Sequence, residues 1–374
     1  MKGIRKMLAA FLALALIGGA APFEAGSFDL SGISLTAQAE DAGSTATLDE
    51  TTGVLTLSGN VVKADVQAFT KDERVTSVVA APGTVLPANC NYLFYQFKSV
   101  MTIDLSKADT SNVTEMNSMF RECISLSSLD ISSFNTSNVT DMEYMFYNCY
   151  KLKSLELSNF NTTNVTTMKH MFAECHVLTS LDLSSFNTSN VKNMFCMFAY
   201  CQALTSLDLS SFNTSKVTNM GSMFYDCYKL KSLDLSSFNT SKATNMAAMF
   251  YDCYELKSLD LSNFNTTNVT TMKWMFYKCK ALTSLDLSSF NTSNVTNMVN
   301  MFAYCQALTS LDLSIFDTSE VTEMRFMFDM CLELKKIIVS KTWNTDNVTD
   351  SAYMFEGSSK LVGGNGTVYD PKHV

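Results

Sequence analysis

The sequence predicts an α/β repeat solenoid of about eleven 26-residue strand–loop–helix coils with one parallel sheet. Cysteines recur every 26 residues, and a Met-Phe pair keeps the same step from Met119-Phe120 to Met327-Phe328. Each repeat contains one segment with a strand pattern and one with a helical pattern. Because a unit of this size cannot bury its apolar face alone, stacked copies must share one continuous core.

The strand pattern is clearest in "SLDLS", where leucines alternate with polar residues as in a half-buried strand. The helical pattern is clearest in "NVTDMEYMFYNCYKL", where apolar residues follow one another at offsets of 3, 3, 1, 3 and 3. Between them lies "SSFNTSN", in which Phe134 can close the end of the coil. We expect Asn135 and Asn138 to bond to backbone groups there, because asparagine suits turns.

The outermost repeats depart from the pattern, as capping repeats do. At the N-terminal end Leu93-Phe94 fills the Met-Phe slot and Phe97 replaces the cysteine. At the other end Met354-Phe355 follows after 27 residues, and Ser358 replaces the cysteine. A block of four coils, 104 residues long, also recurs within the array. We therefore expect the solenoid to cover residues 93–361.

Three segments flank the predicted solenoid. Residues 1–39, with a basic start and an apolar run, suit a signal peptide and pro-segment, cleaved after Ala39 or near Ala20. Residues 40–92 are expected to form an N-terminal β-hairpin or cap, and residues 362–374 to begin a C-terminal segment that stops early. Because no second long apolar run follows, we expect no transmembrane segment in the mature chain, and a secreted or cell-surface location.

The charge balance bears on the partners. Lys and Arg number 27 against 36 Asp and Glu, which gives a formal net charge of −9. Nucleic acids and anionic membranes attract basic surfaces, so neither is expected as a main partner. A hydrophobic content of 47% is ample for a large core.

The repeated motif "MFYDCYKLKSLDLSSFNTS" resembles the BspA-like leucine-rich-repeat surface proteins of bacteria. It is more closely similar to the 26-residue variety once catalogued as a mycoplasma domain of unknown function. The resemblance covers about residues 93–361 and touches both flanks. It implies a leucine-rich-repeat-like solenoid in a secreted or surface-displayed binding protein, with adhesion to host or matrix proteins in some members. It implies no particular ligand.

The cysteines of the array are expected to form a buried, reduced structural ladder. Disulfides are disfavoured, because parallel side chains about 5 Å apart exceed the usual Cβ separation of about 3.8 Å, although some stay an alternative in an oxidising environment. A metal needs ligands around one point, and catalysis needs a base beside one particular thiol. Free cysteine packs well as a small apolar residue. The ladder comprises Cys123, Cys149, Cys175, Cys201, Cys227, Cys253, Cys279, Cys305 and Cys331.

A row of acidic residues lies between the two strand leucines and is expected to face outward from the sheet. Carboxylates stacked about 5 Å apart repel one another. Either the row binds calcium or a basic partner, or serines, solvent and lysines such as Lys153, Lys231 and Lys257 soften the repulsion. The second interpretation is favoured, because repetition multiplies any tolerated residue. The row comprises Asp104, Asp130, Glu156, Asp182, Asp208, Asp234, Asp260, Asp286 and Asp312.

Two classes of function compete. The first is a non-catalytic protein- or glycan-binding module, acting as an adhesin and needing no cofactor. The alternative is a polysaccharide-active enzyme on a parallel β-helix with paired aspartates, or a structural surface-layer component. Against the enzyme, these acids repeat in nearly every coil, and the helical stripe disfavours an all-strand coil. Tyrosines beside the cysteines, including Tyr225, Tyr251 and Tyr254, are a further candidate contact surface.

Overall fold

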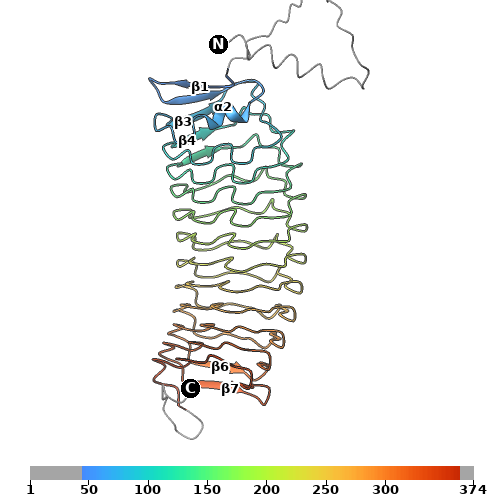
Figure 1. Cartoon of the computed structure of the whole chain (residues 1–374), viewed down its shortest axis with the longest axis vertical. Coiled ribbons are helices and arrows are strands. Elements are labelled where there is room, and N and C mark those ends of the chain that lie inside the picture. Colours follow the sequence, from blue (N-terminus) through green and yellow to red (C-terminus); the bar gives the residue numbers. More distant parts are fainter. Residues whose placement is uncertain (1–43, 363–374) are drawn as a thin grey trace, which may run out of the picture. The chain divides into compact units, whose positions relative to one another are not determined.

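The computed structural model describes residues 44–362. The predicted signal segment, residues 1–39, lies outside the described residues, and so does the predicted C-terminal segment after residue 362. The described chain begins with a small region of strands and one short helix and continues as a stack of coils (Figure 1).

A hairpin opens this region. Strand β1 (Ala46–Asp49) pairs antiparallel with β2 (Val54–Leu57), and the turn between them ends at Gly53. Gly53 has a φ of +72°, and a Cβ there would lie 2.7 Å from the carbonyl oxygen of Arg74. Only glycine meets both conditions, which explains its place in a chain whose coils otherwise use almost none.

The short helix α2 (Lys63–Gln67) packs beside the hairpin. It buries Val66 in the core. The Asp65 carboxylate accepts hydrogen bonds from the backbone N–H and the hydroxyl of Thr45, at 2.8 and 2.9 Å. These bonds fix the helix to the residue that precedes β1.

The strands that follow are all parallel. Strand β2 pairs with β3 (Ser77–Ala80), β3 with β4 (Thr102–Asp104), and β4 with β5 (Ser128–Asp130). The result is a five-stranded sheet in the order β1-β2-β3-β4-β5. At the other end of the array β6 (Ser310–Leu313) pairs in parallel with β7 (Lys336–Val339), as Figure 1 shows.

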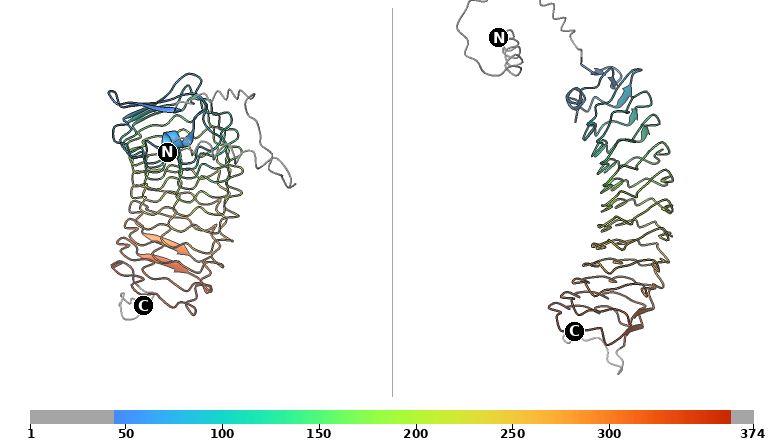
Figure 2. Two further views of the ribbon diagram at one scale, coloured as in Figure 1. Left: turned by 45° about the horizontal axis from the view of Figure 1, so that its top comes forward. Right: turned by 90° about the vertical axis from the view of Figure 1, so that its right-hand side faces the viewer.

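A parallel ladder links the coils along the whole array. One residue of each coil is bridged to its equivalent in the next, in steps of 26 residues that become 27 at the last coil. The predicted solenoid of about eleven stacked parallel coils is therefore confirmed, and Figure 2 shows the coils as successive rungs. The bridged residues are Asn89, Glu115, Asp141, Thr167, Asn193, Asn219, Asn245, Thr271, Asn297, Glu323 and Asp350.

The predicted helix in each coil is wrong. Backbone N–H groups alternate in direction: those of Met145 and Tyr147 donate to carbonyls three residues back, whereas those of Tyr144 and Asn148 donate to the next coil, both at 2.9 Å. Tyr144 and Asn148 have φ values of 57° and 56°, in the left-handed region. Successive three-residue turns therefore produce the offsets that resembled a helix. Among the described residues, α2 is the one α-helix, and it precedes the array.

The SLDLS side is less regular than expected. In the middle coils, between β5 and β6, these segments carry no strand, and no backbone hydrogen bond joins Leu181, Leu207 or Leu233 to a neighbouring coil in the described chain. These three leucines are 7–8% exposed, against 1% for Ile103 in β4 and Leu311 in β6. The coils therefore pack most closely on the turn side, where the continuous ladder runs.

One apolar core fills the interior of the stack. Each coil contributes the same set of valine, methionine, phenylalanine, cysteine and leucine side chains, nearly all of them fully buried. The phenylalanines of the Met-Phe pairs stack from Phe94 to Phe355, with ring centroids 5.5–5.8 Å apart and planes within 8° of parallel. Such an offset stack suits identical rings repeated at the coil spacing.

The SSFNTSN corner joins coils through a buried threonine. The Thr214 hydroxyl donates to the carbonyl of Asn239 in the next coil at 2.9 Å and accepts the N–H of the same residue at 2.8 Å. The asparagines also bond to backbone groups, as expected: Asn135 accepts the N–H of Ser137, and Asn138 donates to the Ser111 carbonyl. Equivalent buried threonines are Thr84, Thr110, Thr136, Thr162, Thr188, Thr240, Thr266, Thr292 and Thr318.

Candidate functional site

The acidic row is exposed, and its aspartates cap turns. The Asp234 carboxylate accepts the backbone N–H of Ser236, two residues on, at 2.9 Å. This is an Asx turn, in which a short carboxylate closes the bend after the strand position. Glu156, whose side chain is longer, makes no such bond in the described chain. The same turn bond, at 2.9–3.0 Å, occurs at Asp104, Asp130, Asp182, Asp208, Asp260, Asp286 and Asp312.

These turn bonds outweigh the repulsion between neighbouring carboxylates. The backbone N–H of Ser236 holds the pKa of Asp234 below its ordinary value, although Asp208 and Asp260 act to raise it. The pKa values of Asp182 and Asp286 are lowered in the same way. One oxygen of each aspartate thus serves the local turn. Within residues 44–362, no group of three or more His, Cys, Asp or Glu side chains converges as a metal site would require.

The nine cysteines of the ladder lie in the core as free thiols. Each Sγ donates to the phenylalanine carbonyl of the preceding coil: Cys227 to Phe198, for example, at 3.1 Å. Burial raises the pKa of Cys227 to about 12, so the thiol is neutral at physiological pH. In the last coil Ser358 fills the slot, and its hydroxyl donates to Phe328 in place of a thiol. The bond recurs at 3.1–3.2 Å in Cys123, Cys149, Cys175, Cys201, Cys253, Cys279, Cys305 and Cys331.

Three tyrosines form a stack on the surface of the turn side. The ring centroids of Tyr225 and Tyr251 are 4.2 Å apart, and those of Tyr251 and Tyr277 are 4.6 Å apart. All three side chains are half-buried. Burial raises the pKa of Tyr277 to about 12. The sequence indicated that tyrosines gather near the cysteines, but the coil geometry was needed to show that they stack.

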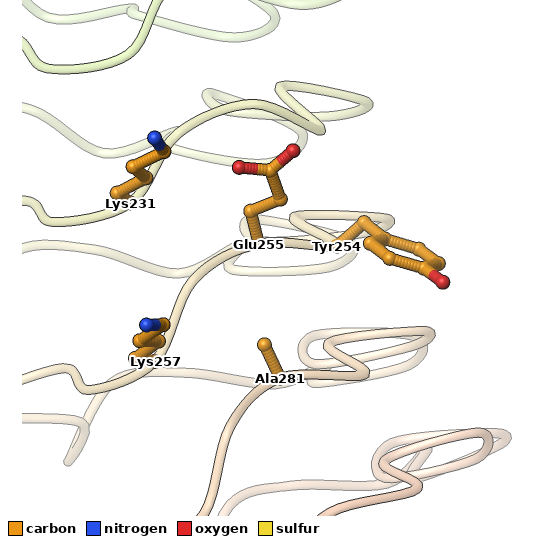
Figure 3. Close-up of a pocket in the computed structure, with 5 residues that line it drawn as sticks. All are labelled: Lys231, Tyr254, Glu255, Lys257 and Ala281. Atoms are coloured by element: carbon orange, nitrogen blue, oxygen red, sulfur yellow. The ribbon is translucent and has the colours of Figure 1, made fainter.

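A partly open hollow of about 290 Å³ lies in the middle of the array. Its lining residues come from three successive coils: Lys231, Tyr254, Glu255, Lys257 and Ala281. Figure 3 shows the two lysines on successive coils to one side of Glu255, with Tyr254 on the other side.

The charges around the hollow are not paired with one another. The sequence led us to expect Lys231 and Lys257 to soften the acidic row, but in the described chain neither forms an ion pair. Lys280 adds a further cation, with its Nζ 4.9 Å from the ring centroid of Tyr254. Sequence reasoning missed this grouping because the residues belong to three coils, up to 50 positions apart, and only the coil stacking brings them together.

In a second aromatic cluster, formed by tyrosines of the first coils, an arginine side chain already lies against the rings. The Arg121 guanidinium lies 4.9–5.6 Å from the ring centroids of Tyr95, Tyr144 and Tyr147. His170 stacks on Tyr144 at 4.6 Å, and burial together with nearby cations lowers its pKa to about 4. A neutral histidine packed on a tyrosine is a structural residue here, since Arg121 fills the space between the rings.

The repeat geometry agrees with a comparison against known protein families. The family described as "Mycoplasma protein of unknown function, DUF285" matches residues 88–206, 153–258, 179–284 and 250–365, which together are well over half of the chain. The chain belongs to this family. The resemblance of the repeated motif to the 26-residue variety catalogued as a mycoplasma domain of unknown function is thereby confirmed. No curated protein matches the chain significantly.

The chain is also similar to several solved structures. A leucine-rich repeat protein from Eubacterium ventriosum is 18% identical, with 86% of this chain and 96% of that chain covered and a TM-score of 0.41. A leucine-rich repeat protein from T. pallidum is 17% identical, with 56% and 86% covered and a TM-score of 0.35. An internalin from Listeria monocytogenes is 15% identical, with 74% and 88% covered and a TM-score of 0.24.

Proposed function

We propose that this chain is a secreted or cell-surface binding module that holds a protein or glycan ligand on its repeated outer surface and performs no catalysis. The observation that carries the proposal is the contrast between core and surface. The core positions hold the same residue types in coil after coil, whereas the exposed turn positions hold different ones. A surface that varies on a regular support suits recognition of an extended ligand.

The chemistry of the reactive side chains supports the same proposal. The thiols are buried and neutral, and each aspartate of the acidic row already accepts a turn bond. A glycosidase needs one pair of carboxylates with differing environments. The aspartates of the row share one environment, so no two of them differ as the acid and the base of a glycosidase do. The coils from residue 93 to 361 contain no helix, so helical content does not separate this array from a β-helix. No helix within residues 44–362 is long and apolar enough to cross a membrane.

The test has two parts. The full chain, labelled with a fluorophore, is applied to an array of extracellular-matrix proteins and glycans, and intact source cells are labelled with an antibody against the chain. We expect saturable binding to at least one class of array component and labelling without permeabilisation. A blank array would overturn the binding role, and labelling that requires permeabilised cells would overturn the location.

A further inference from the structure

We propose that the hollow lined by Lys231, Tyr254, Glu255 and Lys257 binds an acidic sugar, that is, a glycan unit with a carboxylate or sulfate group. This proposal rests on the proposed binding function and names its ligand class and its site. The grouping of two unpaired cations, one carboxylate and one exposed tyrosine around a hollow carries it.

The lysines supply the charge selectivity. Lys231 and Lys257 occupy equivalent positions of successive coils, 26 residues apart, and neither forms an ion pair among residues 44–362. Both side chains line one hollow, and like charges on adjacent coils repel each other, so an anion placed between the two ammonium groups gains from both. In a chain of net charge −9 such unpaired neighbouring cations mark a local site for an anion.

The other two side chains favour a sugar over a simple anion. Glu255 lies between the lysines and Tyr254, where a carboxylate can accept hydrogen bonds from hydroxyl groups (Figure 3). Tyr254 is 46% exposed and offers an apolar ring with a polar end, as aromatic residues at interfaces do. A bare phosphate would use the lysines and be repelled by Glu255. An acidic glycan can place its acid group at the lysines, its hydroxyl groups at Glu255 and a further ring on Tyr254, whose side chain points away from the lysines in Figure 3.

The hollow exists because of the residues that three particular coils bring together. Ala281 occupies the position equivalent to Glu255 in the next coil, and its small side chain leaves the space open. The related four-coil block has Lys153 and Tyr150 at the positions equivalent to Lys257 and Tyr254. There Ser127 replaces Lys231 and Lys151 replaces Glu255, so the grouping of two equivalent lysines around a carboxylate is absent. This related block, which contains Tyr150 and Lys153, therefore provides a matched control within the same chain.

The test measures binding of the full chain by isothermal titration calorimetry. The probes are a hexasaccharide of alternating hexosamine and uronic acid, its sulfated form, a neutral chito-hexasaccharide and a glutamate hexapeptide. We expect binding of at least one acidic hexasaccharide, weakening with added salt, and no binding of the neutral one. The unsulfated and sulfated forms separate carboxylate from sulfate recognition.

The variants are K231Q/K257Q and Y254A, with K153Q and Y150A as controls. We expect affinity for the acidic hexasaccharide to fall at least tenfold in K231Q/K257Q and in Y254A. It should stay within twofold of the parent's affinity in the controls K153Q and Y150A. E255A should also weaken binding, because a hydroxyl acceptor is lost; stronger binding by E255A would overturn the sugar assignment. Circular dichroism melting curves check that each variant is folded, and these exposed positions should leave them unchanged.

The remaining outcomes distinguish failure of the acidic-sugar site from failure of the proposed binding function. Equal binding of the glutamate hexapeptide would show an unselective anion site and would overturn the sugar assignment. Acidic-sugar binding unaffected by K231Q/K257Q, or array binding to other ligands only, would overturn the site and leave the binding function standing. Failure of both the array and the titrations would overturn both proposals.

Discussion

The buried threonines at the SSFNTSN corner should be a main source of stability between coils, and Thr214→Val tests this. Valine keeps the shape of threonine and removes the hydroxyl. Thr214 is fully buried, and its hydroxyl makes two hydrogen bonds, of 2.9 and 2.8 Å, to Asn239 of the next coil. At a net value of about 1 kcal/mol for each bond, the substitution should cost about 2 kcal/mol.

The same coil provides the control. Thr218 is exposed, and its hydroxyl makes one bond, of 3.2 Å, to the Lys192 carbonyl, which also accepts a backbone N–H. Thr218→Val should therefore change the free energy of unfolding by less than about 0.5 kcal/mol. Urea unfolding followed by far-ultraviolet circular dichroism measures both variants and the parent chain. Equal effects of the two substitutions would refute the view that the buried hydroxyls hold the coils together.

Three further predictions concern the titratable groups. Burial raises the pKa of Cys227 and its equivalents, so the native chain should not react with a thiol-specific disulfide reagent. In denaturant every cysteine should react. Fast labelling of the native chain would contradict this. Asp234→Asn should have the melting temperature of the parent, because the amide oxygen can accept the Ser236 N–H. Asp234→Ala should have a lower melting temperature, because the turn bond is lost. Equal melting temperatures for the two variants would argue against the turn bond. Burial, aided by Glu356, raises the pKa of Asp329 to about 6, above an unfolded value of about 3.9. The stability linked to Asp329 is therefore complete below pH of about 4 and is lost as the pH rises through about 6. Asparagine resembles the protonated carboxyl and does not titrate, so urea unfolding should give similar stabilities for the parent and Asp329→Asn at a pH of about 4 and a less stable parent at a pH of about 6; no change in the difference would contradict this.

Much of the fold could be predicted from the sequence because the repeat is nearly identical in each coil. The 26-residue step, the atypical ends marked by Phe97 and Ser358, and the stacked parallel coils all follow from periodicity. The turn side could not be predicted. Apolar residues every three positions suit consecutive turns as well as a helix, and the left-handed positions carry residues such as Tyr144 and Asn148 instead of glycine.

Of the candidate sites, the acidic row could be predicted from the sequence and the hollow could not. The outward direction of the acidic row follows from strand alternation, and a serine two residues after Asp234 was an available sign of the Asx turn. The hollow could not be found from the sequence, because Lys231, Tyr254 and Ala281 belong to different coils. Only the stacking geometry decides which of many surface residues become neighbours.

The left-handed positions also affect how such a chain can change over generations. Each coil holds two of them, occupied by residues as different as Tyr144, Cys196, Asp252 and Trp274, with φ values from 54° to 61°. The backbone there is fixed by hydrogen bonds to the next coil, so the conformation does not depend on the side chain. Mutation can therefore replace those that reach the surface, such as Asp252 and Trp274, with little effect on folding, whereas Cys196 is buried against Ala173 and Ala199. The array is in this sense a frame on which new specificities can be selected, one coil at a time.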